Sequence, residues 1–274
     1  MRRAAWRLAV AVILLWAGWG GARAAEARYY RFGVLPLQSP TMLAKMFLPL
    51  TDALARGLDH PVEFVTAPSF ASFMRRVRRG EYDIIYLNPL LYTRARKAGY
   101  RVIVKVAGEP FTGIVVVRKD SRIRHLGGKG LPKGLKIGFP DPNAYAATVM
   151  VRQYMRSLGL SVKRDFKVRY FGSQDSALMA VYYGLVDMAG TWFPSLRSMP
   201  AKVRRDLRVV AETPPQPQMP IAVRSDMPPR VAARLRHLLT HLTDSAQGRR
   251  VLDHLGFKQG FVAATNREYD GVKP

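Results

Sequence analysis

The turn Pro-Asp-Pro-Asn at residues 140–143 joins a short apolar run to an amphipathic one, and this arrangement could bind an anion. A strand that leads through a tight turn into a helix directs free backbone N–H groups, and the positive end of the helix dipole, toward whatever lies in front of it. Asn143 and Tyr145 stand at this turn and are candidate ligand-binding residues. The turn has Ala144 and Tyr145 where a phosphate cradle usually has Ser, Thr or Gly, so its side chains offer an anion few hydroxyls.

Other polar and aromatic residues stand at or directly after predicted strand ends, where a binding site is expected. In open α/β sheets, ligands bind beyond the carboxyl ends of the strands. Asn88 and Asn143 could serve as helix caps at the same time, and any one of the aromatic residues could belong to the core instead. As a set, these residues predict one pocket lined by aromatic rings and a few amides and hydroxyls. The predicted ligand-binding residues are Ser69, Tyr86, Asn88, Phe111, Thr112, Asn143, Tyr145, Gln174, Thr191 and Trp192.

The sequence has no arrangement of side chains that is typical of an enzyme. Ser173 lacks a neighbouring histidine, which a serine nucleophile needs as its base. His237, His241 and Asp244 have the spacing of metal ligands on one helical face, but histidines on the surface of a helix explain this spacing more simply. The glycine-rich segment 127–134 precedes a strand, whereas a phosphate loop precedes a helix. We therefore expect a binding protein that is not an enzyme, with no cofactor and no metal.

The elements that must position these residues alternate between strands and helices. Apolar runs rich in Val, Ile, Tyr and Phe end in turn residues and lead into amphipathic segments, which is the pattern of successive βαβ units. Ser39 followed by Pro40 is a start signal for the first helix. The expected strands are 29–37, 61–67, 82–88, 100–107, 114–119, 135–139, 166–171, 186–192, 207–213 and 221–225, and the expected helices are 40–56, 69–79, 89–98, 146–157, 174–183, 228–240 and 244–255.

The chain length and a proline-rich stretch predict an α/β protein of two lobes joined by two crossings. The 274 residues are more than one typical domain uses. Crossings are expected near residues 108–113 and 214–220, with hinges near Gly113 and Pro220. Each lobe should hold a mostly parallel sheet flanked by helices, with the ligand in the cleft between the lobes. The predicted divisions are a signal peptide at 1–24, the first part of lobe 1 at 25–112, lobe 2 at 113–216, and a return strand with C-terminal helices completing lobe 1 at 217–274.

The first 24 residues have the pattern of a cleavable secretory signal peptide. Arginines precede an apolar run at residues 8–19, and the small-residue pattern Ala22-Arg23-Ala24 follows it. The apolar run is shorter than the roughly 20 residues that a membrane-spanning helix needs, so a retained anchor is the weaker alternative. The chain has no cysteine, which excludes disulfides and a lipid-modified cysteine. We expect a soluble monomer in the periplasm.

The chain is strongly basic, with a formal net charge of +25 at pH 7. The presumed signal peptide contributes four arginines and no acidic residue, so the mature chain would keep +21. Such a charge favours acidic partners, including a transient contact with anionic membrane surfaces. The basic residues are scattered and follow no nucleic-acid-binding motif, so we expect no nucleic acid as a partner. The densest cluster, at residues 75–79, ends a predicted helix, where the helix dipole favours cations.

Several segments match, in order and spacing, one family of exported proteins. They are residues 32–36 (FGVLP), 69–92 (SFASFMRRVRRGEYDIIYLNPLLY), 119–123 (KDSRI), 128–144 (GKGLPKGLKIGFPDPNA), 172–189 (GSQDSALMAVYYGLVDMA) and 256–257 (GF). Over nearly all of its mature length, the sequence resembles the phosphate, phosphite and phosphonate type of periplasmic solute-binding protein, the capture component of certain ABC importers. The resemblance implies a two-lobe periplasmic-binding-protein fold that closes on a small ligand and passes it to a membrane permease.

The sequence departs from that family where the ligand would bind. The family's Ser-Thr-Ser-Gly type of cluster at the helix N-terminus corresponds here to Asn-Ala-Tyr-Ala at residues 143–146. A histidine common in the family is Gln174, and a common tyrosine is Phe70. These changes remove donors for an oxyanion, for which charge-assisted hydrogen bonds are the strong ones. Phe111 and Trp192 add apolar ring surface to neighbouring loops.

Three functions are compatible with this pattern. The resemblance implies capture of a phosphonate- or phosphate-like solute for an ABC-type or related transporter. The lost hydroxyls and added rings instead favour a carrier of a bulkier hydrophobic or lipid-like ligand on the same scaffold. The third, an enzyme that uses the same fold, is least favoured because paired acid/base groups are absent. A ligand-sensing partner of a signalling protein is a variant of the first function.

Overall fold

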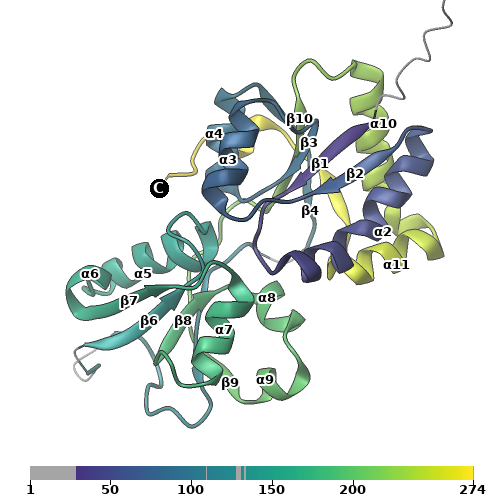
Figure 1. Ribbon diagram of the computed structural model, residues 1–274. Coiled ribbons are helices and arrows are strands. Elements are labelled where there is room, and N and C mark those ends of the chain that lie inside the picture. Colours follow the sequence, from purple (N-terminus) through teal and green to yellow (C-terminus); the bar gives the residue numbers. More distant parts are fainter. Residues whose placement is uncertain (1–28, 109, 128–130, 133, 274) are drawn as a thin grey trace, which may run out of the picture.

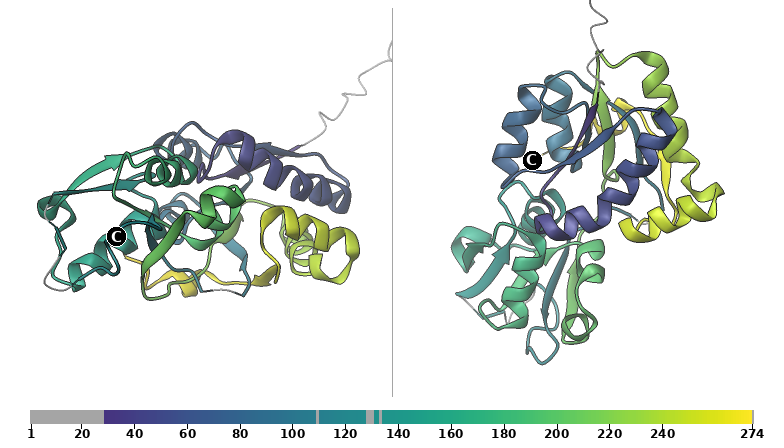
Figure 2. Two further views of the ribbon diagram at one scale, coloured as in Figure 1. Left: turned by 90° about the horizontal axis from the view of Figure 1, so that it is seen from below. Right: turned by 45° about the vertical axis from the view of Figure 1, so that its right-hand side comes forward.

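The computed structural model describes residues 29–108, 110–127, 131–132 and 134–273. The predicted signal peptide and its cleavage point lie outside the described residues. Two α/β lobes lie next to each other, each built on one sheet flanked by helices (Figures 1 and 2). The predicted two-lobe α/β fold is therefore confirmed. Within the described ranges, every helix is too short or too polar to cross a membrane.

The first sheet has six strands in the order β11-β4-β10-β3-β1-β2. Helices α3 and α4 cover one of its faces, and α2, α10 and α11 cover the other (Figure 1). The strands are β1 Tyr30–Val34, β2 Val62–Val65, β3 Ile84–Tyr86, β4 Tyr100–Val106, β10 Pro220–Arg224 and β11 Phe261–Ala263. The helices are α2 Pro40–Leu58, α3 Phe70–Arg78, α4 Pro89–Lys97, α10 Pro229–Thr240, η3 Leu242–Asp244, α11 Ala246–Leu255 and η4 Asn266–Tyr269.

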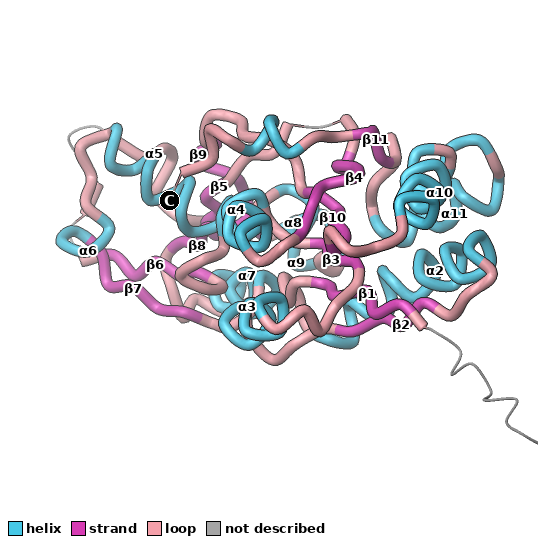
Figure 3. Tube along the Cα trace, turned by 90° about the horizontal axis from the view of Figure 1, so that it is seen from above, coloured by secondary structure: helices cyan, strands magenta, loops and turns pink. Residues whose placement is uncertain are grey.

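The second sheet has five strands in the order β7-β6-β8-β5-β9, and Figure 3 shows the two sheets as separate groups of strands. Alternate residues of β5 belong to two cores, since Ile114 and Val116 pack in one hydrophobic cluster and Val115 and Val117 in another. The strands are β5 Ile114–Arg118, β6 Leu135–Phe139, β7 Phe166–Tyr170, β8 Met188–Thr191 and β9 Leu207–Glu212. The helices are η2 Tyr145–Met150, α5 Val151–Ser157, α6 Val162–Asp165, α7 Gln174–Tyr182, α8 Phe193–Ser198 and α9 Ala201–Arg205.

Both sheets are mixed: most strands of each sheet run in one direction, as predicted, and β10, β11 and β5 run in the opposite direction. The pairs β1–β2, β1–β3, β6–β7 and β6–β8 are parallel, as βαβ units require. Strand β10 pairs antiparallel with β3 and β4, and β5 pairs antiparallel with β8 and β9. The reason is that β5 and β10 each enter their sheet from the other lobe, at the end where the βαβ strands finish, and must therefore run in the opposite direction.

The two chain crossings between the sheets lie side by side. Residues 107–113 lead from β4 to β5, and residues 213–219 lead from β9 back to β10. The Gln216 N–H donates to the Phe111 carbonyl at 2.9 Å, and the Thr213 N–H donates to the Gly113 carbonyl at 2.8 Å. The Thr213 hydroxyl in turn accepts a hydrogen bond from the Gly113 N–H at 2.9 Å. The crossings are thus tied to each other as a short antiparallel ribbon.

Side chains cap three of the predicted helices. Ser69, Asn88 and Ser173 each accept a hydrogen bond from a backbone N–H in the first turn of α3, α4 and α7. Ser39 occupies the predicted start of α2, but its side chain makes no capping bond. Its N–H lies 3.4 Å from an Asp175 carboxylate oxygen in the other lobe. Ser39 therefore takes part in the contact between the lobes.

Candidate ligand site between the lobes

The ends of β1 and β3 in the first lobe lie against the ends of β6 and β8 in the second. The Gln174 N–H donates to the Leu37 carbonyl at 2.9 Å, and the Gln38 amide donates to the Ser198 hydroxyl at 2.8 Å, both across the boundary. The rule that ligands bind beyond the carboxyl ends of strands thus predicted residues that lie close together in the structure. The predicted site residues that the structure brings to this boundary are Tyr86, Asn88, Phe111, Asn143, Tyr145, Gln174, Thr191 and Trp192.

Three aromatic side chains form a buried cluster at this boundary. The ring centroid of Phe111 lies 6.1 Å from that of Tyr145, nearly parallel to it, and 5.5 Å from that of Trp192, edge to face. All three belong to the same hydrophobic core as the first lobe, although Tyr145 and Trp192 come from the second. The Tyr145 hydroxyl donates to the Gln216 amide oxygen at 3.2 Å, which ties the cluster to the second crossing. This part of the boundary is consequently apolar and lined by rings.

Other groups of the protein form hydrogen bonds with the turn at residues 140–143. The Asn143 N–H donates to the Asp141 carboxylate at 2.7 Å. From the other lobe, the Asn88 amide donates to the Asn143 carbonyl at 3.1 Å, and Arg94 donates to the Asn143 side-chain oxygen at 3.2 Å. Asn88 also caps α4 by accepting the Leu91 N–H at 2.8 Å. One amide therefore fixes a helix start and joins the two lobes.

The helix after this turn begins with a π-helical segment, η2, that approaches two strands closely. A Cβ atom on Gly190 of β8 would lie 2.0 Å from the Ala147 carbonyl oxygen, and one on Gly113 would lie 2.1 Å from the Ala146 carbonyl oxygen. Both distances are far below a normal contact, and the atoms met are backbone. Only glycine at these positions lets η2 lie where its first residues reach the inter-lobe boundary.

We expect Gly190→Ala to lower the free energy of unfolding by about 1–3 kcal/mol, because the added methyl group must displace η2 from β8. Gly271→Ala is the matched control, since a Cβ there would have no neighbour within 4 Å. Urea unfolding followed by tryptophan fluorescence measures both variants. Equal stability of the two variants would show that η2 does not need this close approach.

Two predicted site residues lie apart from the ring cluster and serve other contacts. The Thr112 hydroxyl, in the first crossing, donates to the carboxylate of Glu212, the last residue of β9, at 2.8 Å. The Ser69 hydroxyl belongs to a capping box with Ser72 at the start of α3. Gln174 and Thr191, in contrast, are buried at the boundary, where the Thr191 hydroxyl donates to the Gln174 amide oxygen at 2.7 Å. Gln174 is thus positioned by both lobes.

Burial suppresses ionisation of the tyrosines at the boundary. Desolvation raises the pKa of Tyr145 to about 12, and it also raises the pKa of Tyr86. A buried phenolate would lose the hydration that it has in the unfolded chain. Both hydroxyl groups therefore stay neutral at physiological pH and can donate a hydrogen bond.

The raised pKa of Tyr145 predicts a loss of stability in alkali. Below pH 10 the residue is protonated in both states, so its contribution is fully present; between pH 10 and about 12 only the unfolded state releases the proton, and stability falls. Urea titrations at pH 8, 10 and 11 should show this fall. In Tyr145→Phe the fall should be smaller, which separates this residue from other groups that titrate in alkali. An equal fall in both proteins would contradict the prediction.

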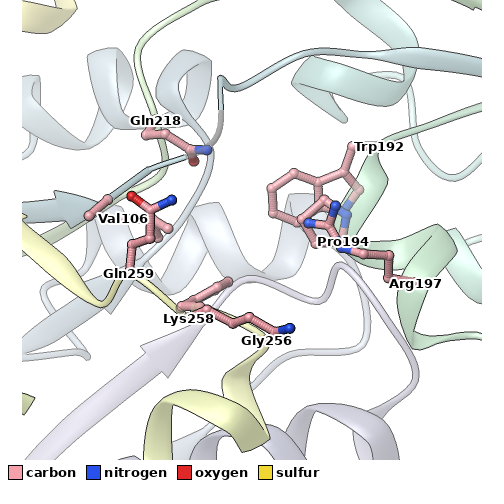
Figure 4. A pocket seen from close by; sticks show the side chains of 10 residues that line it. Val106, Trp192, Pro194, Arg197, Gln218, Gly256, Lys258 and Gln259 are labelled. Atoms are coloured by element: carbon pink, nitrogen blue, oxygen red, sulfur yellow. The ribbon is translucent and has the colours of Figure 1, made fainter. Parts of the chain in front are cut away.

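Two hollows beside the ring cluster complete the site. A cavity of about 200 Å³ lies between Trp192 and Pro194 on one side and Val106, Gln218 and Gln259 on the other, with Lys258 at its edge (Figure 4). A smaller one, of about 20 Å³, lies deeper. It is lined by Leu37, Gln38, Leu43, Met46, Phe47, Tyr86, Trp192, Pro194, Ser195 and Phe257.

The strand-end rule missed the lining residues that come from helices and from the C-terminal region. Pro194 and Arg197 follow Trp192 on α8 and could have been found by extending the predicted loop by one helical turn. Lys258 and Gln259 lie after α11, near the predicted segment 256–257, and no local pattern connects them to the boundary. The Trp192 indole N–H donates to the Ser195 hydroxyl at 2.6 Å, so α8 also orients a predicted residue.

A family model for periplasmic substrate-binding proteins of phosphonate ABC transporters matches residues 32–269. The chain superposes on the binding-protein component of an ABC phosphonate transporter from Pseudomonas aeruginosa with a TM-score of 0.81, at 18% identity, covering 89% of this chain and 84% of that one. A Prochlorococcus marinus protein, PhnD1, solved with methylphosphonate, gives 0.78 at 19% identity, covering 89% and 96%. The aliphatic sulphonate-binding protein SsuA of Escherichia coli gives 0.60 at 17% identity, covering 88% and 82%. At these identities the superpositions establish a shared fold.

Proposed function

Because the chain belongs to the family of ABC-transporter phosphonate periplasmic substrate-binding proteins, we propose that it captures a compact organic anion with an apolar ring or chain between its lobes and delivers it to a membrane permease. The family accounts for the solute-binding role. The observation that supports this ligand class is the buried cluster of Phe111, Tyr145 and Trp192 beside the inter-lobe cavity. Of these rings, Trp192 lines the cavity, and Phe111 packs edge to face against Trp192. A ring in this position can cover the apolar body of a ligand, while a few polar groups orient its charged end.

The turn after β6 supports this choice over inorganic phosphate. A small oxyanion needs several donors, because burying an unpaired charge costs several kcal/mol. Here the turn is followed by alanine and tyrosine, whose side chains offer few donors. The Asn88 amide already donates a hydrogen bond to the Asn143 carbonyl. The Gln174 amide oxygen is occupied by Thr191. A ligand with one anionic group and a larger apolar body requires fewer of these donors.

The proposal includes the setting in which the protein works. The protein is exported with a signal peptide at residues 1–24, which is then removed. It acts in the periplasm as a monomer without enzymatic activity. Its basic surface makes transient contact with anionic membranes. The second lobe spans residues 113–216 in this proposal, and the hinges lie near Gly113 and Pro220. The ribbon formed by the two crossings supports bending there, since each crossing is only a few residues long. Small-angle scattering should show compaction when a tight ligand is added.

A ligand panel tests the proposed function. Calorimetry with inorganic phosphate, methylphosphonate, phenylphosphonate and hexylphosphonate should show the last two binding at least about tenfold more tightly, because each buried CH₂ contributes about 0.8 kcal/mol. Diethyl phenylphosphonate, which has the ring without the charge, is the matched control and should bind weakly. Phosphate or methylphosphonate binding as tightly as phenylphosphonate would overturn the proposed ligand class.

A further inference from the structure

Three adjacent hollows lead from the protein surface toward Tyr86. The outer pocket, of about 300 Å³, lies between α2, α8 and the end of α11. The middle pocket is the cavity of about 200 Å³, and the inner pocket is the one of about 20 Å³. Pro194 lines all three, Trp192 and Phe257 line the middle and inner pockets, and Arg197 and Lys258 line the middle and outer pockets. The hollows therefore form one row between the lobes.

The outer end of this row is positively charged. Arg197 from the second lobe and Lys258 from the first both line it and are exposed. The outer pocket is also lined by Lys45 and His254, and by a single carboxylate, Asp253. An anionic group between Arg197 and Lys258 would contact a cation of each lobe at once. Hydrogen bonds to charged groups are among the stronger polar contacts in proteins.

The middle pocket has apolar walls beside the polar residues Gln218 and Gln259. Trp192, Phe257, Val106 and Pro194 line it, and Trp192 is only 7% exposed. An engineered apolar cavity of about 150 Å³ in another protein holds a benzene molecule. The middle pocket, at about 200 Å³, is thus large enough for one six-membered ring or a chain of similar size.

The inner end of the row offers one polar group. Tyr86 lines the inner pocket, is 1% exposed, and its hydroxyl has no hydrogen-bond partner among the described residues. An unsatisfied buried hydroxyl costs about 1–3 kcal/mol, so a partner that reaches it gains from its presence. The rings that pack on Tyr86, at 5.1 Å for Phe47 and 5.9 Å for Phe257, are apolar and cannot supply that partner.

We infer that the ligand lies along this row with its anionic group outward, between Arg197 and Lys258, and a polar atom at its other end directed to the Tyr86 hydroxyl. This inference rests on the proposed function and adds the orientation and the class: an aryl or cyclic anion with a polar substituent opposite the charge. The anion then lies away from the helix N-terminus at Tyr145. The two cations come from different lobes, so a bound anion also favours the closed arrangement of the lobes.

Removing a positive charge from the outer end of the row tests the proposed position of the anionic group. Arg197→Gln and Lys258→Gln should each weaken phenylphosphonate binding by about 10- to 100-fold in calorimetry, and the affinity should become less sensitive to salt. Lys202→Gln is the control: this exposed cation lies on α9 of the second lobe and lines none of the three pockets. If Arg197→Gln and Lys258→Gln both keep the wild-type affinity for phenylphosphonate while Trp192→Ala loses binding, the proposed ligand orientation is refuted and the proposed function is not.

A substituted ligand tests the inner end. In the wild-type protein, 4-hydroxyphenylphosphonate should bind about fivefold more tightly than phenylphosphonate, since a hydrogen bond contributes about 1 kcal/mol. Tyr86→Phe keeps the ring and should abolish this advantage, so that the two ligands bind the variant with equal affinity. Equal affinities of the two ligands in the wild type, or an advantage that persists in Tyr86→Phe, would refute the inference. Preference for inorganic phosphate over both would refute the proposed function itself.

Discussion

Trp192→Ala is expected to weaken the binding of phenylphosphonate by about 100-fold, which is the effect of removing a central aromatic anchor from a binding site. The indole lines both the middle and the inner pocket and contacts Phe111 edge to face. Its removal takes away the largest apolar wall of the site and admits water beside the ligand. The loss should appear in the dissociation rate, because the rim of the pocket stays unchanged.

Two further variants make this result interpretable. Trp192→Phe keeps an aromatic wall and should lose no more than about tenfold, since only part of the buried area disappears. Circular dichroism and thermal unfolding must show that both variants fold. The opposite outcome would be tight binding of inorganic phosphate that survives Trp192→Ala but is lost in Asn143→Ala. That result would place the ligand at the turn after β6 and refute the ring-lined site.

Phe111→Ala is expected to lower the free energy of unfolding by about 3–5 kcal/mol, the usual range for truncating a buried phenylalanine. Phe111 lies in the first crossing, where its ring contacts Tyr145 and Trp192 and its carbonyl accepts the Gln216 N–H. The ring is 2% exposed, so its removal leaves a cavity at the point where both lobes and both crossings meet. Urea unfolding measures the change.

An exposed aromatic residue of the second lobe provides the control for Phe111→Ala. Tyr183 is 67% exposed, so Tyr183→Ala should change the free energy of unfolding by no more than about 0.5 kcal/mol. If Phe111→Ala also cost less than about 1 kcal/mol, the ring cluster would not contribute to joining the lobes. A broad or two-step transition in Phe111→Ala would instead indicate that the lobes unfold separately, which also tests the proposed lobe boundaries.

Local patterns in the sequence identify much of the fold. The alternation of apolar strands and amphipathic helices predicts most elements to within a few residues, because the residue periodicity of each element reflects which of its faces is buried. The start signal Asn88-Pro89, for example, stands at the beginning of α4, where a helix was predicted to begin. The direction of β5 and β10 was not predictable in this way, because strand periodicity is the same in parallel and antiparallel sheets.

The same distinction applies to the candidate site. The sequence by itself determined which residues stand at strand ends. Tyr145 and Trp192 lie close because the parallel strands β6 and β8 end at one edge of their sheet, and Phe111 contacts both from the first crossing. Only the tertiary structure decided which of them face a cavity. Thr112 is engaged by Glu212, whereas Lys258 reaches the pocket from the C-terminal region. Contacts between residues far apart in the chain depend on how the two crossings set one lobe against the other, and no short-range pattern encodes that geometry.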